Sequence, residues 1–193
     1  MNPSTRTDPF TQLYARKPHH GDLATSEYED AKYTATLRAL PRRRFHNAVA
    51  VGCSIGTLTE RLAPACDALL GIDPVEASPP EARCAALPQR RLARMAIPRD
   101  WPAGEFDLII LSELLDFGLL KDLHILAQRC DASAAPSATI LVINWLGPND
   151  GLLSGEAAAL TFLQDLGDGW ACDNIVLTSK YRIDIARRVG ARV

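Results

Sequence analysis

The chain lacks long apolar runs, a strong charge imbalance and regularly spaced cysteines, and each absence excludes a class of protein. No apolar stretch approaches the roughly 18 residues that span a bilayer, and the N-terminal MNPSTRTDPF has no signal-peptide core, so we expect no membrane partner. The formal net charge is −2 and no basic stripe is interleaved with aromatic residues, so we expect no nucleic-acid partner. The 193 residues, with an apolar fraction of 47%, predict one globular domain with its own core.

The 5 cysteines are scattered, odd in number and never spaced C-x-x-C. This usage is typical of reduced thiols in a cytoplasm, and it argues against a disulfide framework or a zinc site. The adjacent His19 and His20 have no carboxylate or cysteine partner at ligand spacing, so we expect them to be solvated and predict no metal ion. Residues 1–25 are polar and rich in helix breakers, which predicts either a mobile arm or a lid over a site.

The most informative stretch is FHNAVAVGCSIGTLTERLAPACDALLGID, residues 45–73, which has the pattern strand, tight turn, helix, strand. The short apolar run AVAV predicts a strand that ends at Gly52. Thr57 is the predicted N-cap of the following helix, with a glutamate at capping-box spacing, and Pro64 closes that helix. A second apolar run ends abruptly at Asp73, which completes a βαβ unit.

This unit predicts a binding site for an adenosine-containing cofactor. Its turn presents backbone N–H groups and a helix N-terminus, and the Asp73 carboxylate can accept hydrogen bonds from ribose hydroxyls. Gly52 and Gly56 are spaced G-x-x-x-G, whereas dinucleotide sites use G-x-G-x-x-G. The spacing therefore disfavours a nicotinamide or flavin dinucleotide and favours a ribose cofactor without phosphates, such as S-adenosylmethionine. A purely structural turn followed by a surface aspartate is the alternative.

Further apolar runs predict a parallel sheet. The near-continuous run FDLIIL, residues 106–111, suits a strand buried on both faces, and it ends at Ser112 and Glu113, at the edge where open α/β sheets bind ligands. The remaining predicted strands are the short segments 90–96, 139–143, 175–177 and 181–185. The last two of these are expected to form an antiparallel closing pair. The remaining predicted helices are one that begins near Ser26 and those over 81–87, 122–130 and 156–166.

The stretch AVGCSIGTLTERLA, followed by LLGID, resembles the first two cofactor motifs of class I S-adenosylmethionine-dependent methyltransferases. Within that class, the chain looks most like the nodulation protein S group of N-methyltransferases, and the likeness extends through DPF, SEYEDAKYTATLRALPRRRF, WPAGEFDLIILSELL and INWLGPND. The resemblance implies a Rossmann-like α/β fold, with a mostly parallel seven-stranded sheet, helices on both faces and an antiparallel closing strand. Residues 1–193 would form a single domain, with the cofactor-binding core over 45–145 and a C-terminal helix and closing strands over 146–193.

The resemblance also implies a cofactor, S-adenosylmethionine, and an acceptor, an amine on a small or sugar-like molecule, with oxygen acceptors left open. The residues that we expect to bind the cofactor are Gly52, Cys53, Ser54, Gly56, Asp73, Pro74, Ala96, Ile97 and Ser112. Those that we expect to contact the acceptor are Tyr28, Asn144 and Trp145, and Lys32 is a candidate for contact with either ligand. Glu113 and Asp116 are the expected catalytic residues, because a carboxylate can orient an amine or accept its proton. The alternative is that Glu113 caps the next helix and Asp116 is solvated.

Three residues depart from the pattern of the family and keep a second function open. Ala50 stands where the family usually has an acidic residue, Ser54 replaces the second glycine of the turn, and Asn144 replaces an expected histidine. Loss of one charge-assisted hydrogen bond at Ala50 costs on the order of 1.5–3 kcal/mol, or about tenfold to a hundredfold in affinity. Asn144 cannot take up a proton at neutral pH. The alternative function is a degenerate, methyltransferase-like binding or regulatory partner with weak or no cofactor binding.

Overall fold

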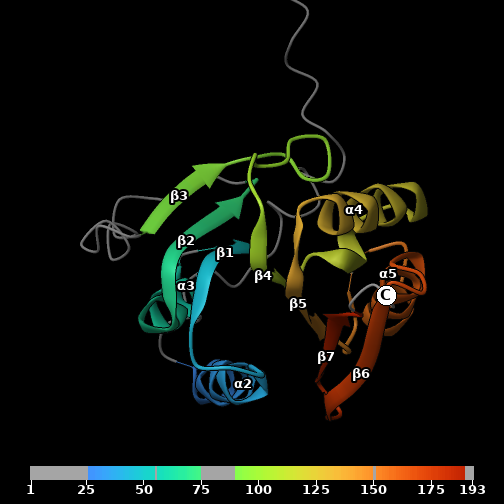
Figure 1. Ribbon diagram of the computed structural model, residues 1–193. Coiled ribbons are helices and arrows are strands. Elements are labelled where there is room, and N and C mark those ends of the chain that lie inside the picture. Colours follow the sequence, from blue (N-terminus) through green and yellow to red (C-terminus); the bar gives the residue numbers. More distant parts are fainter. Residues whose placement is uncertain (1–25, 55, 75–89, 150, 190–193) are drawn as a thin grey trace, which may run out of the picture.

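The structure is a computed structural model, in which residues 26–54, 56–74, 90–149 and 151–189 are described. The described residues form a seven-stranded sheet in the order β3-β2-β1-β4-β5-β7-β6 (Figure 1). The strands are β1 (Phe45–Val51), β2 (Cys66–Asp73), β3 (Arg90–Arg94), β4 (Phe106–Ser112), β5 (Ala134–Trp145), β6 (Trp170–Leu177) and β7 (Tyr181–Arg188). The helices are α2 (Glu27–Ala39), α3 (Thr57–Leu62), α4 (Leu120–Ala132) and α5 (Gly155–Asp165), with 3-10 turns η1 (Ala63–Ala65) and η3 (Leu115–Phe117).

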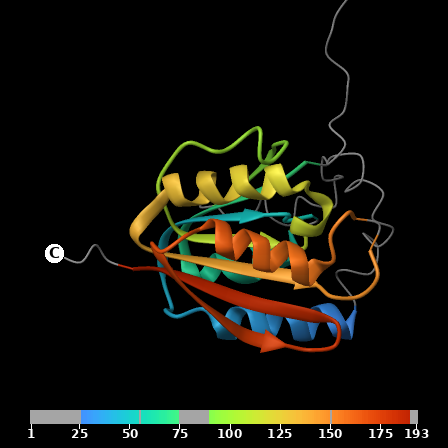
Figure 2. The same cartoon turned by 90° about the vertical axis from the view of Figure 1, so that its right-hand side faces the viewer.

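The directions of the strands confirm the predicted fold class. Strands β3, β2, β1, β4 and β5 are parallel, whereas β7 is antiparallel to both of its neighbours, β5 and β6. The parallel strands bring their carboxyl ends to one edge, which is the ligand-binding edge of open α/β sheets. Figure 2 shows α4 and α5 on one side of this sheet and α2 on the other.

Alternate residues of the central strands pack into two separate cores, because side chains point to opposite faces with a period of two. Val49 of β1 and Ile109 of β4 pack with α4 and α5, whereas their neighbours Ala48 and Leu108 pack with α2 and α3. Both faces of β1 and β4 are therefore buried, which explains why these strands read as near-continuous apolar runs.

Two helix starts test the capping predictions. Ser26 is the N-cap of α2, as predicted, and its Oγ accepts from the Glu29 N–H at 3.5 Å. The prediction for α3 was wrong by one residue: the N-cap is Gly56, and Thr57 is the first helical residue. The reason is that the first helical hydrogen bond runs from the Glu60 N–H to the Gly56 carbonyl, at 2.8 Å.

The fifth strand is longer than predicted, because it begins at Ala134 instead of Thr139. Its early residues are drawn into the sheet where Phe106 pairs with Ala134, and a register shift between Phe106 and Leu108 accommodates the extra length. The predicted arm at 1–25 and the predicted helix at 81–87 lie outside the described residues. Among the described helices, none combines the length and the hydropathy needed to cross a bilayer.

Candidate functional site

The turn between β1 and α3 is a bend whose first residue must be glycine. Gly52 has a φ of +76°, and a Cβ added to it would lie under 3.0 Å from the Ser112 carbonyl oxygen. The Gly52 N–H donates to the Ile72 carbonyl at 2.9 Å, and the Gly56 N–H donates to the Cys53 carbonyl at 2.8 Å. The bend is therefore packed against the carboxyl ends of β2 and β4, so that predicted site residues from these elements meet at one edge of the sheet.

Asp73, the last residue of β2, holds the middle of this bend. The Ser54 N–H donates to Asp73 Oδ2 at 2.8 Å, and Asp73 is only 4% exposed, so the alternative of a surface aspartate is wrong. Ser54 has a φ of +46°. A left-handed backbone costs a residue with a side chain about 1–2 kcal/mol, which the bond to Asp73 offsets. Ser54 thus forms the bend at a position where the family pattern has glycine.

The loop after β3 closes on itself. The Ala96 N–H donates to Asp100 Oδ2 at 3.0 Å, and the Ala96 carbonyl accepts from the Asp100 N–H at 2.9 Å. Ile97 is buried, and the Pro74 carbonyl accepts from Arg94 Nε at 3.3 Å. The backbone N–H and carbonyl of Ala96 therefore both take part in its own turn. Contact of Ala96 and Ile97 with the cofactor stays a prediction.

Glu113 follows β4 and pairs with α2. Its backbone has a φ of +51°, and its N–H donates to the Ile143 carbonyl at 2.7 Å. Its Oε1 accepts from Lys32 Nζ at 2.5 Å, and the same ammonium donates to Glu29 Oε1 at 2.8 Å. Helix α4 begins only at Leu120, so the alternative that Glu113 caps the next helix is wrong. The catalytic role of Glu113 stays a prediction.

Asp116 lies in η3 and is 2% exposed, so the alternative that it is solvated is also wrong. Asn149 Nδ2 donates to Asp116 Oδ2 at 3.0 Å and to the Leu153 carbonyl at 3.1 Å, while Asn149 Oδ1 accepts from the Gly151 N–H at 3.0 Å. Asp116 therefore helps to fasten the loop between β5 and α5. The catalytic role of Asp116 stays a prediction.

Three aromatic rings join α2 to the ends of β5 and β7. The Tyr28 ring lies 5.8 Å from the Trp145 ring and 5.8 Å from the Tyr181 ring, in edge-on geometry. The Tyr28 hydroxyl is buried and has no hydrogen-bond partner in the described part of the chain. Burial raises the pKa of Tyr28, and the carboxylates of Glu113 and Glu29 raise it further. Tyr28 is therefore a neutral phenol at physiological pH, with an unused O–H donor.

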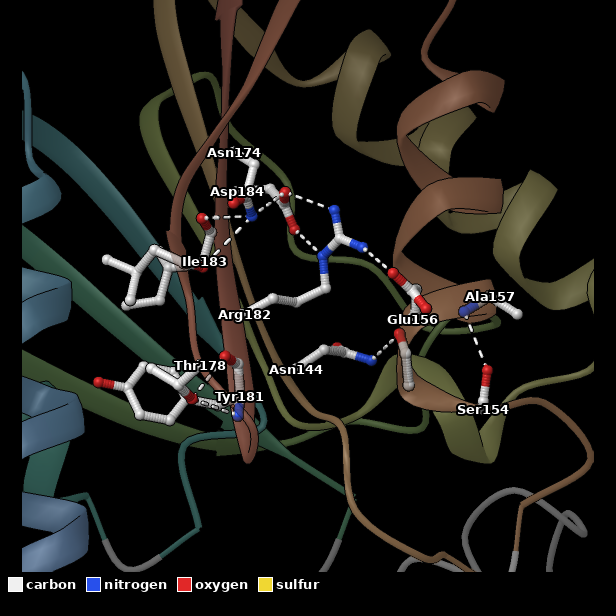
Figure 3. Close-up of polar contacts among 12 residues, drawn as sticks. Asn144, Ser154, Glu156, Ala157, Asn174, Thr178, Tyr181, Arg182, Ile183 and Asp184 are labelled. Atoms are coloured by element: carbon white, nitrogen blue, oxygen red, sulfur yellow. Dashed lines mark hydrogen bonds and ion pairs between the residues drawn. The ribbon is translucent and has the colours of Figure 1, made fainter.

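Asn144 is directed towards α5. It is 0% exposed, its Nδ2 donates to the Gly155 carbonyl at 3.0 Å, and its Oδ1 has no hydrogen-bond partner among the described residues (Figure 3). Beside it on β7, Arg182 donates to both carboxylate oxygens of Asp184, at 2.7 and 2.8 Å (Figure 3). Contact of Asn144 with an acceptor stays a prediction, and the structure shows that Asn144 ties β5 to the start of α5.

Two ion pairs, the partly buried Lys32–Glu113 and the buried Arg182–Asp184, have no clear signal in the sequence. The i, i+3 spacing of Glu29 and Lys32 indicates that those two side chains can pair. The contact between Lys32 and Glu113 joins residues 81 positions apart, so no local pattern predicts it. Arg182 and Asp184 alternate with apolar residues, which is typical of a solvated face, but the structure buries both.

A family model described as nodulation protein S (NodS) matches residues 10–128 of the chain. A curated nodulation protein S from Bradyrhizobium diazoefficiens is 29% identical over 126 residues, which are 62% of this chain and 59% of that protein. The chain thus spans 59% of the length of the curated relative that it matches.

Solved structures are similar over most of the chain. The structure of a proposed methyltransferase from Pseudomonas syringae is 29% identical, with a TM-score of 0.69, and the alignment covers 84% of this chain and 100% of that one. The N-methyltransferase NodS from Bradyrhizobium japonicum, in complex with S-adenosyl-L-homocysteine, is 19% identical, with a TM-score of 0.73 and coverage of 94% and 99%. The second likeness shows the fold alone.

Proposed function

The chain belongs to the nodulation protein S family, and on this basis we propose that it is an S-adenosylmethionine-dependent methyltransferase, a single-domain enzyme that N-methylates an amine on a small or sugar-like acceptor. The proposal includes a cytoplasmic location and no nucleic-acid or membrane partner. The observation that carries it is the bend at Gly52, which Asp73 holds at the carboxyl edge of a parallel sheet.

Two features of the structure fit the cofactor. A Cβ at Gly52 would clash with the Ser112 carbonyl oxygen, so glycine lets the bend pack directly against the carboxyl end of β4, where we propose that the nucleoside binds. Asp73 accepts from the Ser54 N–H through Oδ2, and a carboxylate has about four acceptor sites, so the same group can also bind ribose hydroxyls. We propose that these residues hold the cofactor, together with Cys53, Gly56, Pro74, Ala96 and Ile97.

The residues proposed for the acceptor lie along the same edge. Tyr28 and Trp145 supply apolar ring surface, and the Tyr28 hydroxyl, which has no partner among the residues described, supplies a hydrogen-bond donor. Glu113 and Asp116 supply the carboxylates, and Asn144 ties the end of β5 to the start of α5. Since a phenol with a raised pKa cannot take up a proton, a carboxylate is the proposed acceptor of the proton of the amine.

When bound, S-adenosylmethionine supplies a methyl group that is already electrophilic. The protein residues are then needed chiefly for alignment and for the exclusion of water, and alignment of two reactants can supply roughly 7–11 kcal/mol. In this proposal, Asp73 and the bend fix the nucleoside, the aromatic rings of Tyr28 and Trp145 fix the acceptor, and Glu113 receives the proton that the amine loses.

Calorimetry with S-adenosylmethionine and S-adenosylhomocysteine tests the cofactor, with Asp73→Asn as the variant and Asp67→Asn as the matched control. Both aspartates lie on β2, but Asp67 is at the opposite end and pairs with Arg44 and His46 at the surface. We expect Asp73→Asn to weaken binding about tenfold to a hundredfold and Asp67→Asn to leave it unchanged. No heat from the wild-type chain at millimolar ligand would refute the methyltransferase proposal and favour the degenerate binding partner.

The acceptor is tested by transfer of a tritiated methyl group to a panel of aminosugars, amines and phenols. Transfer to amines and not to phenols is the expected result. If the chain binds the cofactor and methylates only phenols, the N-methyltransferase part of the proposal is wrong and the cofactor part stands.

A further inference from the structure

Lys32 is a fully enclosed cation in the middle of α2. It is 1% exposed, and among the described residues its ammonium contacts two carboxylates and two rings: Glu29 and Glu113 at 2.8 and 2.5 Å, and the Tyr28 and Tyr33 ring centroids at 5.2 and 5.8 Å. Removing an ammonium from water is costly, and replacement of a buried ion pair by apolar groups is often neutral or stabilising. Stability alone therefore does not explain a charge here, and its partner at the sheet edge suggests another reason.

That partner, Glu113, is held in an unusual way. Its left-handed backbone, with a φ of +51°, follows directly after β4, and its N–H is bonded to the Ile143 carbonyl of β5 at 2.7 Å. The backbone is thus fixed from the β5 side, and the carboxylate is fixed from the α2 side by Lys32. Residues in such backbone regions cluster at functional sites, where the surrounding contacts hold them in place.

Several described charged and phenolic groups lie close enough to this carboxylate to influence its protonation. Glu29 and Lys32 face it from α2, where they bring one negative and one positive charge. The phenols of Tyr28 and Tyr33 lie close enough to interact electrostatically with Glu113. Tyr181 packs against the Tyr28 ring, and the ammonium of the exposed Lys180 lies 5.2 Å from the Tyr28 ring centroid. Among the described residues, Lys32 is the cation in direct contact with Glu113. Its positive charge favours the ionised carboxylate of Glu113, and the negative charge of Glu29 opposes this effect.

We propose that Lys32 is a positioning residue, whose buried ammonium holds the Glu113 carboxylate ionised and in one orientation at the ligand edge, with Glu29 as the second anchor of that ammonium. This inference rests on the proposed methyl transfer, since it explains how Glu113 is kept ready to receive a proton. Lys32 acts through Glu113 and touches neither ligand.

The test uses the full chain labelled with ¹³C at the glutamate carboxyl carbons, and the Glu113 signal is assigned by its loss in Glu113→Gln. In Lys32→Met the titration midpoint of this signal should rise by about 1–3 pH units, because removal of a cation favours the neutral carboxyl. In Glu29→Gln the midpoint should fall, because a like charge is removed while Lys32 remains. Lys32→Arg keeps the charge and should restore most of the wild-type midpoint.

Two further readouts separate the possible outcomes. The affinity for S-adenosylhomocysteine should stay within about twofold in Lys32→Met, while kcat, measured with whichever amine the panel identifies, should fall about tenfold to a hundredfold at unchanged KM. Midpoints that move in the same direction in Lys32→Met and Glu29→Gln, or not at all, overturn the inference. Loss of cofactor affinity in Lys32→Met would also overturn it, since Lys32 would then be a cofactor ligand.

The titration does not require turnover, so failure of the methyltransferase proposal and failure of this inference give different results. Thermal unfolding of each variant shows whether it is folded. If Lys32→Met does not fold, Glu29→Gln retains the ammonium and its downward midpoint decides the question.

Discussion

A Gly52→Ala substitution tests the close packing of the bend against β4. Gly167→Ala is a matched control, because Gly167 has a nearly identical φ of +73°, against +76° at Gly52. The two glycines differ in their surroundings. A Cβ at Gly167 would meet nothing within 4 Å, whereas a Cβ at Gly52 would lie under 3.0 Å from the Ser112 carbonyl oxygen and 3.2 Å from Leu114 Cδ2.

The structure fixes the expected magnitudes. A left-handed backbone costs alanine about 1–2 kcal/mol in either variant. In Gly52→Ala the Ser112 carbonyl belongs to a buried parallel strand and cannot turn away, so overpacking adds about 1–3 kcal/mol. For a chain of this size, 1 kcal/mol corresponds to roughly 2–4 °C in Tm. The Tm of Gly52→Ala should therefore lie at least about 2 °C below that of Gly167→Ala.

Differential scanning calorimetry, with and without S-adenosylhomocysteine, measures both effects. The ligand should raise the Tm of wild type and of Gly167→Ala equally, and it should raise that of Gly52→Ala less, because a displaced bend and its partner Asp73 no longer fit the nucleoside. Equal Tm values for the two variants would show that the bend is loosely packed. An equal ligand-induced rise would show that the cofactor does not bind at the bend.

Two further predictions concern buried groups away from the bend. Burial raises the pKa of the Cys66 thiol to about 11, because it disfavours the thiolate. Cys66 should therefore resist iodoacetamide at pH 8 in the native chain, react at high pH or in urea, and react much more slowly than the exposed Cys172. Mass spectrometry of the labelled peptides measures both rates, and equal rates would contradict the prediction. Arg182→Met should lower the free energy of unfolding, measured in urea, by about 3–5 kcal/mol, because it leaves the buried Asp184 carboxylate without its cation. The double variant Arg182→Met, Asp184→Asn should lose less free energy than the sum of the two single variants. Additive losses would show that the pair is not coupled.

The fold and the bend were predictable because their signals are local. Gly52 and Asp73 mark the ends of consecutive strands within one βαβ unit, and the Ser54–Asp73 bond spans only 19 positions. The closing antiparallel pair was also predicted, although the register shift that lengthens β5 was not, since it depends on pairing with Phe106 of another strand. The N-cap of α3 was predicted at Thr57 but lies at Gly56, and a single hydrogen bond, from the Glu60 N–H to the Gly56 carbonyl, makes that difference.

The acceptor side was harder to predict, because its contacts come from side chains distant in the sequence. Glu113 was expected to cap a helix or face the ligand edge, and no pattern predicts that Lys32 of α2 binds it. Asp116 was predicted to be catalytic and Asn144 to contact the acceptor, and both roles stay predictions. The structure shows that each of them binds the segment that leads into α5.

These two sides of the proposed site are built by different physical means, and this has a consequence for specificity. The bend is a backbone structure that tolerates few side chains, so it can vary little without loss of the fold. On the proposed acceptor side, α2 supplies Tyr28, whose ring packs against Trp145, and Lys32, which holds Glu113. A change in α2 can alter that side while the strand ends that it covers stay in place. We therefore expect that acceptor choice is set mainly by α2, and that exchange of its exposed and half-buried residues changes the acceptor before it changes the cofactor.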